Sequence, residues 1–87
     1  SMKKIIIYSS AYCPYCSAAK ALLEQKKLIF KEILIDNNNK VKSKMIELSK
    51  GRKTVPQIFF GESHIGGFDD LKKISDDGDI EKILNDE

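Results

Sequence analysis

Residues 12–23 read YCPYCSAAKALL, and they contain both cysteines of an 87-residue chain. The cysteines stand three positions apart, with Pro14 directly after the first. From Tyr15 onward, apolar residues recur at the three- and four-residue spacing of a helix. Proline suits the first turn of a helix, so the stretch predicts a helix from Pro14 to about Lys27, with Cys13 at its N-terminal cap.

Apolar runs on both sides of this helix predict strands. KKIIIYSS at residues 3–10 is β-branched and apolar, and IFKEILID at residues 29–36 alternates between two faces. Further elements are expected at residues 37–51 (a helix with Val41, Met45 and Leu48 on one face), at 56–60 and 63–67 (two strands joined by a turn), and at about 69–75 and 79–85 (two helices). The order β-α-β-α-β-β-α, with an extra C-terminal helix, predicts an α/β fold with a four-stranded mixed sheet covered by helices. Its first two strands should be parallel and its last two antiparallel.

Length and composition favour a single domain over residues 1–87, near the lower limit for independent folding. Ser1, which precedes Met2, is interpreted as the remnant of an expression tag. No apolar run approaches the ~18 residues of a membrane span. Lys3 and Lys4 precede only three isoleucines, too few for a signal peptide. We therefore expect a monomeric, cytoplasmic protein with no membrane partner.

The net charge of +2 hides an asymmetry along the chain. Residues 1–54 hold twelve Lys and Arg against four Asp and Glu, whereas residues 55–87 hold three against nine. Six of the basic residues lie between Lys40 and Lys53. This cluster is interpreted either as a solvated helix face or as a local binding site for carboxylates. No aromatic residue interleaves this stretch, so no nucleic-acid partner is expected.

The cysteine pair has three interpretations: a zinc site, a structural disulfide or a redox dithiol. A structural zinc site needs four ligands, and the chain offers two cysteines and one histidine, His64, so no metal is expected. His64 is interpreted as a surface or packing residue. A disulfide closing a four-residue loop contributes only ~1.9 kcal/mol by chain entropy, against ~3 for fifteen residues. The spacing therefore favours a redox dithiol.

The two cysteines are predicted to have different roles in this dithiol. Cys13 is expected at the helix cap, where free N–H groups and the positive end of the helix dipole stabilise a thiolate. Cys16 should lie one turn inside the helix, less exposed and directed at Cys13. Cys13 is thus the predicted nucleophile and Cys16 the resolving thiol, and these two are the predicted catalytic residues.

Three segments together resemble the dithiol glutaredoxins of the short bacterial type, in the thioredoxin-like superfamily: CPYC at residues 13–16, TVPQIF at 54–59 and IGGFDDL at 65–71. The resemblance implies a thioredoxin-like fold and a glutathione-dependent thiol–disulfide oxidoreductase. No cofactor would be bound, and glutathione would be the reducing co-substrate. The partners implied are glutathionylated or disulfide-containing proteins, and indirectly glutathione reductase.

The resemblance also implies a glutathione site. A cis bond between Val55 and Pro56 would present the Val55 backbone to the ligand, and the γ-glutamyl end would lie near Gly67. The implied binding residues are Tyr15, Thr54, Val55, Pro56, Gly67, Asp69 and Asp70. Many family members carry a lysine where this chain has Ser10, so Arg52 and Lys53 are the candidate contacts for the glycine carboxylate.

Two alternatives to a glutathione-dependent enzyme remain open from the sequence. One is a redoxin recharged by thioredoxin reductase, which the Ser10 departure favours slightly. The other is a carrier of an iron–sulfur cluster ligated by glutathione and by Cys13 of two chains, which Pro14 disfavours by stiffening the loop.

Overall fold

The computed structural model describes residues 2–86, and every predicted helix and strand occurs in it. The elements are β1 (Ile5–Ser9), α1 (Pro14–Gln25), β2 (Phe30–Leu34), α2 (Asn39–Leu48), β3 (Gln57–Phe60), β4 (Ser63–Gly66), α3 (Phe68–Asp76) and α4 (Ile80–Asn85). The order predicted from the sequence is confirmed.

The four strands form one mixed sheet in the order β2-β1-β3-β4. β1 runs parallel to β2 and antiparallel to β3, and β3 runs antiparallel to β4. The predicted parallel and antiparallel pairs are confirmed. The pairing of β1 with β3, which closes the sheet at its centre, was not part of the prediction. It aligns Tyr8 with Gln57.

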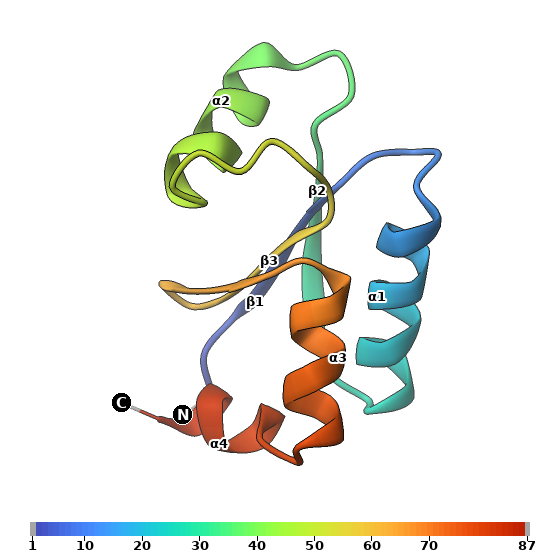
Figure 1. Cartoon of the computed structure of the whole chain (residues 1–87), viewed down its shortest axis with the longest axis vertical. Helices are drawn as coiled ribbons and strands as arrows, with labels where there is room; N and C mark the ends of the chain where they lie inside the picture. The colour runs from blue at the N-terminus through green and yellow to red at the C-terminus, as the bar shows by residue number, and fades with distance from the viewer. Residues whose placement is uncertain (1, 87) are drawn as a thin grey trace.

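Helices cover both faces of the sheet (Figure 1). The helices α1 and α3 lie side by side against one face, and α2 lies against the other. Successive side chains of a strand point to opposite faces of the sheet, so each strand contributes apolar side chains to the cores on both faces. The larger core contains Ile5, Ile7, Ala19, Leu23, Ile58, Phe60, Leu71, Ile80 and Leu84. The smaller core, under α2, is built around Tyr8, Met45 and Phe59.

One detail of α2 differs from the sequence-based expectation. Met45 is fully buried and Val41 packs against the smaller core, as predicted. The prediction that Leu48 shares this face is wrong, because Leu48 is 43% exposed and Ile46 packs there instead. Leu48 is the last residue of the helix.

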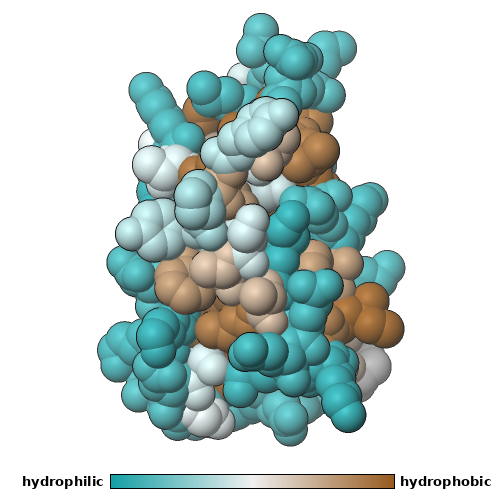
Figure 2. All heavy atoms as spheres, turned by 90° about the vertical axis from the view of Figure 1, so that its right-hand side faces the viewer, coloured by the Kyte–Doolittle hydropathy of each residue, from teal (hydrophilic) through white to brown (hydrophobic). Residues whose placement is uncertain are grey.

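The surface over α1 is mostly hydrophilic, with separate hydrophobic patches between the polar side chains (Figure 2). This agrees with the burial of Cys16, Ala19 and Leu23 on the inward side of the helix. Within residues 2–86, no helix has both the length and the apolar character needed to cross a membrane.

The strand directions bring three connections to one edge of the sheet. β1 and β4 end at this edge, and β3, which is antiparallel to both, begins there. The segment from β1 to α1, the segment before β3 and the turn from β4 to α3 therefore meet. They carry the three sequence segments singled out above.

Candidate active site

Cys13 and Cys16 occupy the N-terminal end of α1 and are joined by a disulfide bond. Cys13 is the N-cap residue, and its sulfur accepts a hydrogen bond from the Cys16 backbone N–H at 3.1 Å. The Cys13 side chain is partly exposed, whereas Cys16 is only 1% exposed. An incoming thiol can therefore reach Cys13 more easily than Cys16; the roles of nucleophile and resolving thiol stay predictions.

The segment before β3 lies directly beside Cys13. The Cys13 sulfur is 3.8 Å from the carbonyl oxygen of Val55. The Val55–Pro56 peptide bond is cis, as the resemblance implied. Pro56 is buried and Val55 partly buried, so the segment is held in place against the sheet. This arrangement puts the Val55 backbone, just before β3, next to the sulfur where exchange would begin.

A groove of about 480 Å³ opens beside this backbone. Tyr15 and Phe68 both line this groove, and the centroids of their rings are 6.1 Å apart. The groove is lined by Tyr15, Arg52, Thr54, Val55, Pro56, Gly67, Phe68, Asp69 and Asp70. All seven binding residues implied by the resemblance are in this set, together with Arg52. Lys53 is exposed and does not line the groove.

The groove is lined by one basic and one acidic side chain, and the two form an ion pair. Arg52 Nη1 lies 3.4 Å from Asp70 Oδ2, and both side chains are about half exposed. The same Asp70 oxygen accepts a hydrogen bond from the Gly67 N–H at 2.9 Å, at the start of α3. Gly66 adopts a φ of +121°, a conformation that glycine accommodates without strain. Because the Arg52 and Asp70 side chains are about half exposed, each can also pair with a ligand group of opposite charge.

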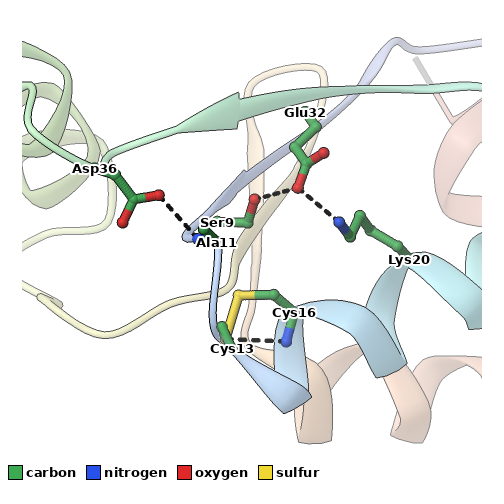
Figure 3. Close-up of polar contacts among 7 residues, drawn as sticks. All are labelled: Ser9, Ala11, Cys13, Cys16, Lys20, Glu32 and Asp36. Carbon is green, nitrogen blue, oxygen red and sulfur yellow. Dashed lines mark hydrogen bonds and ion pairs between the residues drawn. A yellow bond between two sulfur atoms is a disulfide. The ribbon is translucent and has the colours of Figure 1, made fainter.

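Two carboxylates, one in β2 and one just after it, hold the segment that leads into Cys13 (Figure 3). The Asp36 carboxylate accepts a hydrogen bond from the Ala11 N–H at 2.9 Å. The Glu32 carboxylate accepts one from the hydroxyl of Ser9, which is fully buried, and pairs with Lys20 Nζ at 2.8 Å. The hydrogen bonds from Lys20 and then from Ser9 lower the pKa of Glu32, so it is ionised at neutral pH.

His64 is a packing residue, as predicted. Its Nε2 lies 2.7 Å from the Gln57 amide oxygen, and its ring stacks on Phe59 with centroids 4.9 Å apart. Burial, aided by the charge of Arg52, lowers the pKa of His64. The ring is therefore neutral at pH 7, and its hydrogen bond joins β4 to β3.

Several residues of this region were not predicted as part of the site. Phe68 lies inside the IGGFDDL segment at residues 65–71. Its position between Gly67 and Asp69, two residues implied to bind glutathione, could have marked it as part of the site. Glu32, Asp36 and Lys20 are charged residues on an ordinary strand end and helix. Nothing in their spacing indicates the contacts that the parallel pairing of β1 with β2 creates.

The comparisons with known proteins agree on one family. A family model described as Glutaredoxin matches residues 5–65. The chain is 48% identical over 81 residues to Glutaredoxin 1 of Rickettsia prowazekii, covering 92% of this chain and 85% of the relative. It is similar to the solution structure of a glutaredoxin from Brucella melitensis, with a TM-score of 0.84, 44% identity and coverage of 97% and 90%. A buckwheat glutaredoxin–glutathione complex matches with a TM-score of 0.83, 29% identity and coverage of 94% and 76%.

Proposed function

Because this chain belongs to the glutaredoxin family and is a thiol–disulfide oxidoreductase with a Cys13–Cys16 pair, we propose that glutathione is its reducing co-substrate. The observation that carries the proposal is the groove beside Cys13, whose lining includes one basic and one acidic side chain, Arg52 and Asp70. The buckwheat relative was solved in complex with glutathione, which supports the same ligand here.

The charged groups of glutathione have partners of opposite sign in the two charged side chains of this groove. Glutathione carries two carboxylates and one ammonium, with its thiol in the central residue. The Val55 backbone, beside the Cys13 sulfur, pairs with that central residue as an added strand would. Asp70 pairs with the ammonium, and the N–H groups at the start of α3, near Gly67 and Asp69, bind the adjacent carboxylate. Arg52 binds the glycine carboxylate, with Lys53 as a second cation nearby.

In a one-thiol cycle, the Cys13 thiolate attacks the glutathione sulfur of a glutathionylated substrate. The substrate leaves as a thiolate, and Cys13 carries glutathione as a mixed disulfide. A second glutathione thiolate attacks the bound glutathione sulfur, which yields glutathione disulfide and restores the Cys13 thiolate. Cys16 takes no part in this cycle.

In a two-thiol cycle, Cys13 attacks a disulfide of a protein substrate and releases one of its sulfurs as a thiolate. Cys16 then attacks the Cys13 sulfur and releases the second, leaving the Cys13–Cys16 disulfide. Two glutathione molecules reduce that disulfide and leave as glutathione disulfide. The proposed substrates are therefore glutathionylated proteins and protein disulfides.

The choice of reductant tests this proposal. Reduction of a glutathionylated peptide and of a protein disulfide should proceed with glutathione, glutathione reductase and NADPH. Turnover should be at least about tenfold slower when thioredoxin reductase and NADPH replace them, because the groove binds glutathione directly. Turnover with thioredoxin reductase and none with glutathione would show that the protein is a redoxin recharged by thioredoxin reductase.

Arg52→Met should raise the KM for glutathione about tenfold with little change in kcat, since a charge-assisted hydrogen bond contributes about 1.5–3 kcal/mol. Lys53→Met should have a smaller effect, because Lys53 does not line the groove. Lys42→Met, a change at an exposed residue of α2, is the control for loss of one positive charge. Steady-state kinetics with varied glutathione measure all three. An Arg52→Met enzyme with the KM of Lys42→Met would refute the role of Arg52.

A further inference from the structure

A cluster of three polar side chains lies outside the glutathione groove and close to the dithiol (Figure 3). Ser9 ends β1, Glu32 lies in β2 and Lys20 lies in α1. The Glu32 carboxylate accepts from the Ser9 hydroxyl and pairs with Lys20 at 2.8 Å. The side chains of Lys20 and Glu32 are only 29% and 30% exposed, so water screens this pair less than a fully exposed one.

The ion pair lies next to Cys16 in the helix. Lys20 follows Cys16 by four residues, so their side chains occupy the same face of α1 on successive turns. Helical side chains lean toward the N-terminus, and Figure 3 shows Lys20 extending back toward the end of α1 that carries the disulfide. The Lys20 side chain therefore begins about one turn from Cys16, a residue that is only 1% exposed, and its ammonium extends back toward it.

Because Cys16 is buried, the thiolate that it becomes during the catalytic cycle is poorly stabilised. When a thiolate attacks the Cys13 sulfur of the oxidised pair, the Cys13–Cys16 bond breaks and its electron pair goes to Cys16. A second thiolate attacks the resulting mixed disulfide, so Cys13 leaves as a thiolate and a small disulfide is released. The Cys16 thiolate then exchanges protons with water, so the reduced protein holds Cys16 as thiolate and thiol in equilibrium, and whatever stabilises the thiolate favours the dithiol. Water solvates the departing Cys16 thiolate poorly, so fixed charges nearby decide how readily it leaves.

We propose that the Lys20–Glu32 ion pair sets the electrostatic potential at the buried Cys16 sulfur, and so sets the balance between the dithiol and the disulfide. Lys20 stabilises the Cys16 thiolate, and Glu32 offsets part of that effect while fixing where the ammonium lies. Both are positioning residues that act through Cys16. The proposal rests on the dithiol activity of the family and requires no particular reducing thiol.

The two members of the pair should have opposite effects. Glu32→Gln keeps an oxygen that can accept from the Ser9 hydroxyl but leaves Lys20 uncompensated, which favours the dithiol. Lys20→Met keeps the length of the side chain but removes the cation, which favours the disulfide. A purely structural role predicts no such difference in sign, because both changes break the same contact between α1 and β2.

The test is the redox equilibrium of each variant in a buffer of 2-mercaptoethanol and its disulfide, with oxidised and reduced protein counted by alkylation and mass spectrometry. A unit charge about one helical turn away should change the equilibrium constant about threefold. We expect Glu32→Gln to shift it toward the dithiol and Lys20→Met toward the disulfide. Lys72→Met and Asp76→Asn remove the members of a 3.0 Å pair on α3 and should change it less than about 1.5-fold. Shifts of equal sign, or shifts no larger than those controls, would overturn the proposal.

A second measurement isolates Cys16. In the Cys16→Ser background, the alkylation rate of Cys13 should change less than about twofold on adding Glu32→Gln or Lys20→Met. An effect that persists at full size without Cys16 would contradict action through that sulfur. Because 2-mercaptoethanol does not need the glutathione groove, both measurements remain valid if the glutathione proposal fails.

Discussion

Cys13→Ser should reduce the glutathione-dependent turnover of a glutathionylated peptide by more than about a hundredfold, to the rate of direct exchange with glutathione. Cys13 is the partly exposed sulfur, at the helix cap and next to the Val55 backbone. Serine keeps the side-chain shape but forms no nucleophile of comparable strength at neutral pH. A coupled assay with glutathione reductase measures the loss.

Cys16→Ser is the matched control for that experiment. It removes the other sulfur of the same disulfide, and the one-thiol cycle should retain activity within about fivefold of the parent enzyme. Reduction of a protein disulfide should decline much more, because the resolving thiol is gone. If Cys16→Ser were the inactive variant and Cys13→Ser the active one, the assigned roles would be reversed.

Gly66→Ala should weaken glutathione binding about tenfold and lower the free energy of unfolding by about 2–3 kcal/mol. The φ of Gly66 is +121°, which alanine adopts only with strain. A Cβ there would collide with the Asp70 carboxylate and lie 3.0 Å from Arg52 Nη1. Asp70 would lose its hydrogen bond from the Gly67 N–H, and the acidic side chain of the groove would be displaced. Calorimetric titration and denaturant unfolding measure the two effects.

Gly51→Ala separates backbone strain from this collision. Its φ is +102°, and a Cβ there would meet no atom within 4 Å. This variant should lose about 1 kcal/mol of stability through strain and bind glutathione as the parent does. Equal binding losses in the two variants would show that the collision at Asp70 is not the cause.

The fold was readable from the sequence because its local signals are strong and consistent. Helical spacing followed Pro14, β-branched runs marked β1 and β2, and a turn separated β3 from β4. The position of β3 beside β1 was not readable, since antiparallel pairing of distant strands leaves no local signal. The predicted burial of Leu48 was wrong for a related reason. Leu48 is the last residue of its helix, and helical spacing does not determine burial where the helix ends.

The site could be predicted only in part, because some of its contacts depend on which strands are neighbours in the folded sheet. The roles predicted for Cys13 and Cys16 rest on their place at a helix N-terminus, and the groove residues came from motifs that the resemblance made specific. The contacts of Asp36 and Glu32 depend on which strand is adjacent and in what register. The Ser9–Leu34 pairing of β1 with β2 is a property of the folded sheet. Charged residues that act through such contacts have no motif of their own.

The most direct test of the central claim is the identity of the covalent intermediate. Cys16→Ser protein is mixed with a glutathionylated peptide in the absence of free glutathione, quenched with acid and analysed by mass spectrometry. The account predicts that Cys13 carries glutathione and that the peptide is released as a free thiol, because the groove beside Val55 binds the glutathione part. Cys13 joined to the peptide, or a protein that remains unmodified while the wild type turns over, would contradict it.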